Sequence, residues 1–197
     1  MKNLIAGIVI SAAVLGACSG NRSSKNEGSV ATPEMAEAGS LASAETPVIH
    51  SKTTISVKEI VDPYLKLKNA LTSDNSPDAS NLGTLLGAAM KKFDKTSLDP
   101  EHMKIFDDIQ ADAAEHAEHI AANSGDIEHQ REHFEMLSTD IYDLVKVFSA
   151  GQVLYKEFCP MYNNGKGAFW LSESKEIKNP YFGSEMPTCG VVKEIVN

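Results

Sequence analysis

The stretch PEHMKIFDDIQADAAEHAEHIAANSGDIEHQREHFEMLSTDIYDLVKVFSA, residues 100–150, decides the fold. Its apolar residues recur at helical spacing on both sides of a short polar turn at residues 123–126. Asp99 and Asp126 are the expected N-caps, and Gly125 is the expected stop of the first helix. Helices joined by a short turn usually pack antiparallel. The stretch therefore predicts two antiparallel amphipathic helices, over about 100–123 and 127–150.

Two further helices precede this pair. An apolar face with helical period covers about 56–73, and a second covers about 78–93. Pro63 is unfavourable inside the first helix, so an alternative start places Asp62 at the N-cap and Pro63 in the first helical position. Together the four segments predict a mainly α fold, a four-helix bundle.

The C-terminal tail, from Leu154 onward, has a different composition. It is rich in glycine, proline and aromatic residues, which predicts turns and short extended pieces, with two short strands near 168–171 and 191–195. Its aromatic side chains are too many to remain exposed. We therefore expect an irregular tail packed on the bundle.

The N-terminus carries a targeting signal. Lys2 precedes an apolar run that is too short for a permanent membrane span, and the run ends in Leu15-Gly16-Ala17-Cys18. This ending resembles a bacterial lipobox, which implies cleavage before Cys18 and acylation of that cysteine. The chain then divides into a lipoprotein signal peptide (1–17), a lipid-anchored flexible linker (18–52) and one folded domain (53–197). We expect a periplasmic protein anchored to a bacterial membrane, the outer one by preference, through its N-terminal lipid alone.

Charge and cysteine count narrow the possible partners. The chain has 18 Lys and Arg against 27 Asp and Glu, a formal net charge of −9, which opposes binding to nucleic acid. Of its three cysteines, acylation of Cys18 would leave Cys159 and Cys189 as an even pair. In an envelope compartment such a pair is either oxidised or protected by a metal ion.

Two sulfur motifs stand near the C-terminus, Cys159-Pro160-Met161 and Met186-Pro187-Thr188-Cys189. Two thiolates and two thioethers form a soft ligand set, which favours Cu(I) or Ag(I) over hard cations. Alternatively, Cys159 and Cys189 form a disulfide and the methionines fill the core, or the thiols are buried and inert. The sequence leaves a metal site and a disulfide as about equal alternatives.

Histidines provide further candidate ligands. His116 and His119 lie three residues apart in one predicted helix, and His129 and His133 lie four apart in the next, so each pair shares a helix surface. The two pairs flank the short turn and can approach each other, either as a Zn²⁺ or Cu²⁺ site or as a contribution to the sulfur set. Helical geometry favours His119 and His133 as ligands, because His116 falls on the buried stripe and His129 points more outward. The competing interpretation is that each is an ordinary core or surface histidine.

Templates for catalysis are absent from the sequence. It contains no Gly-x-Ser-x-Gly, no phosphate-binding glycine loop and no Cys-x-x-Cys, and the helical region lacks the Glu-x-x-His of di-iron bundles. Cys159 with a helix histidine as base would lack a third, orienting residue. We therefore expect a protein that is not an enzyme.

The tail motifs are similar to a known domain of unknown function. The similar segments are Tyr155-x-x-Phe158-Cys159-Pro160-Met161, Gly167-Ala168-x-Trp170-Leu171-Ser172, Asn179-Pro180-Tyr181-Phe182-Gly183-x-x-Met186-x-x-Cys189-Gly190 and Gln130-Arg131-x-x-Phe134-x-x-Leu137-Ser138. They resemble an uncharacterised bacterial envelope domain, found as stand-alone lipoproteins and appended to periplasmic adaptor subunits of copper/silver and other heavy-metal efflux pumps. The resemblance implies a site at Cys159, Met161, Met186 and Cys189, and an efflux adaptor or another envelope protein as partner.

The resulting expectation is a lipid-anchored periplasmic protein that binds a soft metal ion, Cu(I) or Ag(I), in metal resistance or delivery. The expected metal ligands are Cys159, Met161, Met186 and Cys189, with His119 and His133 added from helix geometry. The alternative is a protein-interaction module without a cofactor, stapled by a Cys159–Cys189 disulfide. Free thiols in the native protein would exclude the alternative.

Overall fold

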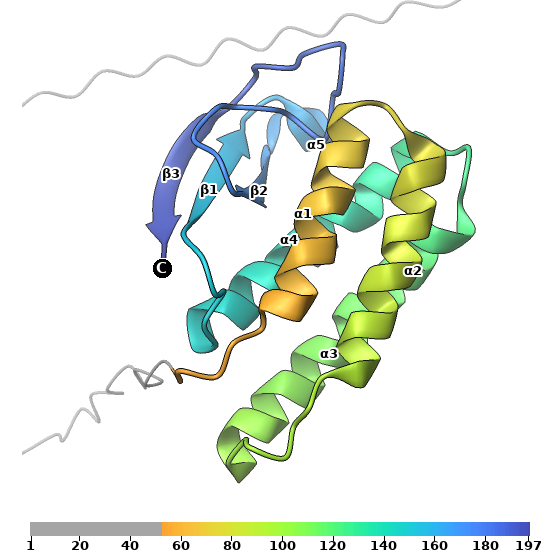
Figure 1. Ribbon diagram of the computed structural model, residues 1–197. Helices are drawn as coiled ribbons and strands as arrows, with labels where there is room; N and C mark the ends of the chain where they lie inside the picture. Colours follow the sequence, from red (N-terminus) through yellow and green to blue (C-terminus); the bar gives the residue numbers. More distant parts are fainter. Residues whose placement is uncertain (1–52) are drawn as a thin grey trace, which may run out of the picture. The chain divides into compact units, whose positions relative to one another are not determined.

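The computed structural model describes residues 53–197, and these form a helical bundle followed by a small sheet (Figure 1). The helices and strands, in chain order, are α1 (Lys58–Thr72), α2 (Ser76–Lys92), α3 (Pro100–Ala122), α4 (Ile127–Val147), β1 (Leu154–Cys159), α5 (Tyr162–Gly165), β2 (Ala168–Ser172) and β3 (Val191–Val196). The predicted four-helix bundle is confirmed. The predicted signal peptide (1–17), the linker (18–52) and the acylated Cys18 lie outside the described residues.

The helix ends follow from local capping. Asp99 accepts hydrogen bonds from the backbone N–H groups of Glu101 and His102, and Asp126 accepts one from His129. Both predicted N-caps are thus confirmed. Asn75 caps α2 by accepting from the Asp78 N–H, so this helix begins at Ser76, slightly earlier than predicted.

The alternative start of α1 at Asp62 is wrong, because the helix begins at Lys58 and Pro63 lies inside it. A proline at this position forfeits one backbone hydrogen bond. Ile60 and Val61 precede it and are fully buried. Burial of their side chains offsets the lost hydrogen bond, since each contributes roughly 1.5–3 kcal/mol relative to exposure.

The helices pack as neighbours in sequence, with α2 against α1 and α3, and α3 against α4. A small residue permits the close approach of α2 to α3. A Cβ placed on Gly83 would lie 2.8 Å from the Ala117 carbonyl oxygen. Close packing at this point sets the position of α3, which carries two of the candidate ligands.

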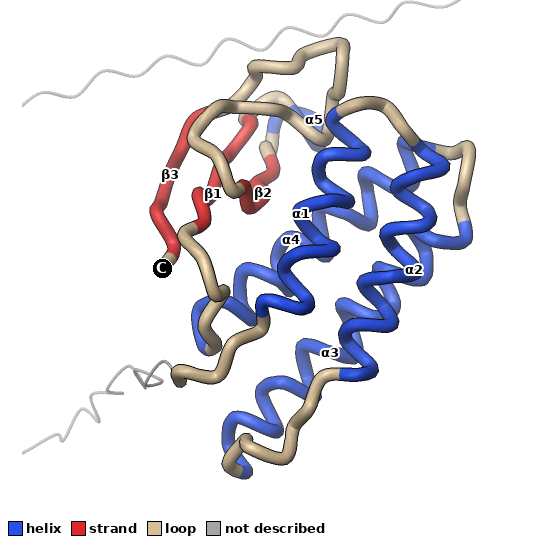
Figure 2. The backbone as a smooth tube through the Cα atoms, viewed as in Figure 1, coloured by secondary structure: helices blue, strands red, loops and turns tan. Residues whose placement is uncertain are grey.

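The tail forms a three-stranded antiparallel sheet in the order β2-β1-β3 (Figure 2). The strands near 168–171 and 191–195 are confirmed as β2 and β3. The central strand β1 was not predicted. Its residue Glu157 is fully buried, so a charged side chain occupies an inward position and hides the alternation that identifies a strand.

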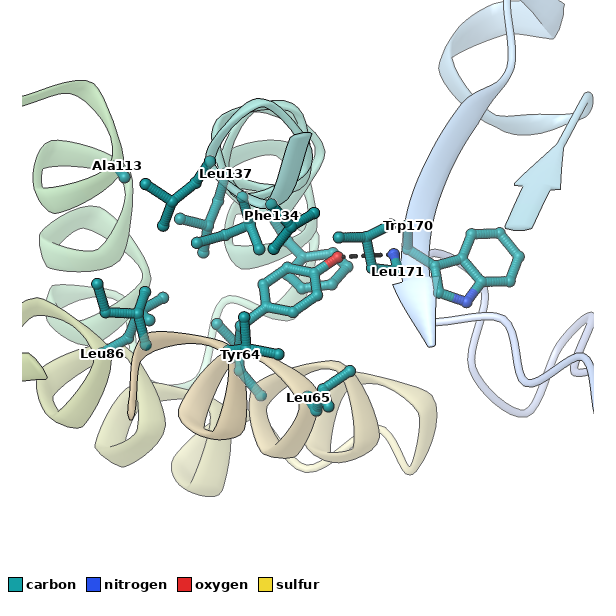
Figure 3. Packing of buried hydrophobic residues seen from close by; sticks show 14 of the residues in the cluster. Tyr64, Leu65, Leu86, Ala113, Phe134, Leu137, Trp170 and Leu171 are labelled. Atoms are coloured by element: carbon teal, nitrogen blue, oxygen red, sulfur yellow. Dashed lines mark hydrogen bonds between the residues drawn. The ribbon is translucent and has the colours of Figure 1, made fainter. Parts of the chain in front are cut away.

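The sheet packs on α1 and α4, and Tyr64 joins all three (Figure 3). The buried ring of Tyr64 stacks on Phe134 of α4 at 5.2 Å between centroids. The Tyr64 hydroxyl lies 2.8 Å from Ser138 Oγ and accepts a hydrogen bond of 3.0 Å from the backbone N–H of Leu171 in β2. The predicted packing of the tail on the bundle is confirmed.

No helix between residues 53 and 197 combines the length and hydropathy needed to cross a bilayer.

Candidate metal centre

Four histidines meet where α3 ends and α4 begins. His116 and His119 project from the last turns of α3, and His129 and His133 from the first turns of α4. The turn between the helices is held by Asp126 and by a 2.7 Å hydrogen bond from the Gly125 N–H to Ser76 Oγ. The turn makes the helices antiparallel, so the two histidine pairs face each other across the helix junction.

Three of the four histidines converge as a metal site requires. One ring nitrogen from each of His119, His129 and His133 lies within 4.8 Å of the other two. Over residues 53–197, this is the one group of three or more His, Cys, Asp or Glu side chains with such convergence. We call it the histidine trio. Imidazole nitrogens are good ligands for Zn²⁺, Cu²⁺ and Ni²⁺, and three of them leave a position open in a tetrahedral site.

His133 is the centre of the ring contacts. Its ring stacks on His119 at 4.2 Å between centroids and meets the His129 ring edge-on at 4.6 Å. His116 approaches from the other side, with its Nδ1 3.3 Å from the Nδ1 of His133. All four rings thus lie in one connected cluster, with His119 exposed and the other three half-buried.

The surroundings favour uncharged imidazoles. Burial lowers the pKa of His116, and burial together with the neighbouring histidines lowers the pKa of His133. Only an unprotonated nitrogen can bind a metal ion, so a lowered pKa keeps these two residues ready for binding at neutral pH. Glu132 lies 3.5 Å from His129, and its carboxylate adds negative charge beside the cluster.

A carboxyl group stands behind the cluster. The Nε2 of His116 lies 3.9 Å from Oδ2 of Asp140, two turns along α4 from His133. Burial, and then the charges of Asp112 and Asp143, raise the pKa of Asp140 to about 7. Oδ2 is buried and has no hydrogen-bond partner.

The sequence favoured His119 and His133 as ligands and set His129 aside, whereas the structure brings all three histidines together. The helical period alone places His129 on an outward-facing side of α4. The turn sets α3 against that side of α4, so that His119 lies beside His129 with 6.0 Å between the two ring centroids. The i, i+4 spacing of His129 and His133 was the sequence feature that could have identified His129 as a member of the cluster.

The sulfur motifs form a separate site. Cys159 of β1 is buried, and Cys189 is half-buried. Burial raises the pKa of the Cys189 thiol to about 11, and its hydrogen bond with Cys159 adds to the shift. The structure therefore brings the two thiols together, as both the metal and the disulfide interpretations require. Neither thiol is part of the histidine trio.

The two methionines occupy different surroundings. Met161 is 58 % exposed and lines a surface hollow of about 430 Å³ with Glu132, Glu135 and Tyr162. Met186 is half-buried in the loop before β3, where its carbonyl accepts a hydrogen bond from the Cys189 N–H. With Met161 largely exposed, the four predicted sulfur ligands are unequal, and the cysteine pair is the better-defined part.

Comparisons with known proteins gave one kind of result. No curated protein and no solved structure matches the chain, but its helical part is similar to a family model. Residues 60–153, which contain most of α1, all of α2–α4 and the four clustered histidines, match the model of a family described as protein of unknown function (DUF3347).

Proposed function

We propose that this protein binds a transition-metal ion through His119, His129 and His133. The observation that carries the proposal is the convergence of three imidazole nitrogens within 4.8 Å of one another. The ligands are imidazoles with acidic side chains nearby, which suits a borderline divalent ion such as Zn²⁺ or Cu²⁺. Together with the signal sequence and lipobox-like Cys18, this suggests an acylated envelope protein that holds or delivers metal ions.

A titration of the purified full-length chain tests this function. Zn²⁺ and Cu²⁺ are added in competition with a chromophoric chelator, and the bound metal is counted. We expect one ion per chain. Exchange of His129 or His119 for alanine should raise the Kd at least as much as the roughly 10- to 100-fold typical of outer-shell changes.

The matched control is Glu118→Ala. Glu118 is an exposed neighbour of His119 on the same helix and is not part of the trio. Its exchange should leave both the far-ultraviolet circular dichroism spectrum and the Kd close to those of the parent. Equal affinity in the parent, His119→Ala and His129→Ala would refute the trio as the binding site.

The cysteine pair supports a second candidate function, the binding of Cu(I) or Ag(I) in metal resistance or delivery. Cys159 and Cys189 contact each other through a side-chain hydrogen bond, and a pair of cysteine sulfurs is a soft ligand set. An efflux adaptor or another envelope protein would be the partner in this function. The alternative is a Cys159–Cys189 disulfide that staples a protein-interaction module.

Thiol counting separates these possibilities. The protein is purified anaerobically, and free thiols and bound metal are measured on one sample before and after addition of Cu(I). Two free thiols and about one retained Cu(I), lost in Cys159→Ser but kept in His129→Ala, would establish a soft site at the cysteines. No free thiols and no retained Cu(I) would establish the disulfide instead.

A further inference from the structure

His116 and His133 are joined by a hydrogen bond between two ring nitrogens. The Nδ1 atoms of the two imidazoles lie 3.3 Å apart across the junction of α3 and α4. The side chain of His116 is only 17 % exposed, so little water competes for this contact. His116 is not a member of the histidine trio, and its role therefore differs from that of a ligand.

This hydrogen bond decides which nitrogen of His133 is free to bind a metal ion. A neutral imidazole carries one N–H and one lone pair, and a hydrogen bond at one nitrogen determines the tautomer. Nδ1 of His133 is engaged with His116, so Nε2 is the nitrogen that remains for the ion. Nε2 has a lone pair only when the hydrogen of the ring is on Nδ1. His133 is then the donor of the bond, and His116 is the acceptor.

The surroundings of His116 favour the acceptor role. When Nδ1 of His116 accepts, the hydrogen of this ring is on Nε2. That nitrogen faces Oδ2 of Asp140 at 3.9 Å, which is too long for a hydrogen bond but places a carboxylate oxygen beside the N–H. Oδ2 is buried, so its charge is weakly screened. Attraction between this charge and the Nε2–H group stabilises the tautomer in which His116 accepts from His133.

His129 has a similar arrangement nearer the solvent. Its Nδ1 lies 3.5 Å from Oε2 of Glu132, so a carboxylate favours an N–H at Nδ1 and leaves Nε2 for the ion. The Glu132 side chain is 68 % exposed, and water therefore weakens this interaction. Both trio members on α4 thus have an acceptor beside Nδ1, and the less exposed acceptor, His116, is the one able to fix a ring.

We propose that His116 is a positioning residue of the metal centre, which accepts a hydrogen bond from Nδ1 of His133 and so leaves Nε2 of His133 for the ion. This inference rests on the proposed function of the histidine trio. Metal-binding histidines usually donate their second ring N–H to an acceptor, which fixes the ring and raises the basicity of the ligand nitrogen. Here the acceptor comes from α3, the helix that also carries His119. The bond therefore holds the His133 ring in place relative to a ligand on the other helix.

The tautomer of His133 is measured first, in the metal-free full-length protein at pH 8. Long-range proton–nitrogen correlations in NMR spectra distinguish an Nδ1–H from an Nε2–H imidazole, and pH 8 lies above the ordinary histidine pKa of about 6.5. We expect the Nδ1–H tautomer for His133 and the Nε2–H tautomer for His116. An Nε2–H tautomer of His133 in the parent would overturn the inference, whatever the affinity for metal.

Two variants of His116 then test its effect on metal binding. His116→Leu removes the acceptor, whereas His116→Asn keeps an oxygen acceptor close to the position of Nδ1. His116→Leu should populate both tautomers of His133 and raise the Zn²⁺ Kd by roughly 10- to 100-fold, as outer-shell changes do. His116→Asn should keep the Nδ1–H tautomer and a Kd close to that of the parent. Circular dichroism checks that both variants are folded.

The outcomes separate this inference from the proposed function. A parent that binds no Zn²⁺ would refute the proposed function, and the inference would fall with it. Binding that is lost in His129→Ala but keeps its Kd in His116→Leu would leave the three-histidine site and overturn the role of His116. Equal losses of affinity in His116→Leu and His116→Asn, with the tautomer of His133 unchanged, would show that His116 only fills space, which would also overturn its positioning role.

Discussion

Glu157 should make this protein less stable as the pH rises from acidic to neutral. Its side chain is fully buried in β1, and neither carboxyl oxygen has a hydrogen-bond partner. Burial raises the pKa of Glu157 from 4.5 to about 7, although the nearby charge of Lys68 opposes the shift. The folded protein thus holds a proton that the unfolded chain loses at lower pH.

The sign and size of the effect follow from linkage. Between pH 4.5 and 7 the folded state binds more protons than the unfolded state, so the free energy of unfolding falls as the pH rises. Each pKa unit corresponds to about 1.4 kcal/mol, and the shift of Glu157 therefore represents about 3 kcal/mol. The contribution is fully present below pH 4.5 and is lost by about pH 7.

The assay compares the parent with Glu157→Gln, whose amide does not titrate in this range. Urea unfolding is followed by circular dichroism at several pH values between 4.5 and 7.5, with chelator present to keep the histidines free of metal. Histidines with lowered pKa values contribute a pH dependence of opposite sign, but they are common to both proteins and cancel in the difference.

We expect the difference in free energy of unfolding between the two proteins to change by about 3 kcal/mol over this range. The change favours the glutamine variant at the higher pH. A difference that stays constant would refute the raised pKa. If the free energy of unfolding of the parent instead rose with pH relative to that of the variant, attraction to Lys68 would outweigh the cost of burial.

Two further substitutions test the packing of the C-terminal tail on the bundle. Tyr64→Phe removes a hydroxyl that bonds Ser138 and Leu171, and leaving these buried groups without a partner should lower the free energy of unfolding by about 2–4 kcal/mol in urea titrations with an unchanged m value. A change below 0.5 kcal/mol would contradict this. Gly183→Ala places a Cβ against the Asp74 carboxylate at a backbone φ of +50°, so we expect a clear drop in melting temperature. The control is Gly125→Ala. Gly125 has open space around it, so its exchange should cost only the strain of a φ of +101°.

The helices were predictable from sequence because their determinants are local. Asp99 and Asp126 are N-caps, which identify the first residues of α3 and α4, and the apolar period then continues without interruption for several turns. The β1 strand was not predictable in this way. Its inward-facing Glu157 lies near Lys68 and Trp170, which come from a distant helix and a neighbouring strand.

The candidate site was predictable in part for a similar reason. Helical spacing showed that His119 and His133 lie on the edges of their apolar stripes. It could not show that His129 faces α3, since this depends on how the turn at 123–126 orients one helix against the other. The partnership of His116 with Asp140 depends equally on the register of α3 along α4.

The position of the clustered histidines in the chain has a consequence for biosynthesis. All four lie within residues 116–133, inside one helix–turn–helix segment, whereas the two cysteines meet only after β1 and the end of the tail have paired. Contacts between residues close in the chain form faster than distant strand pairing. The nascent chain can therefore assemble its imidazole cluster while the sheet is still unformed, and an ion bound at this stage would hold the two helices together early in folding.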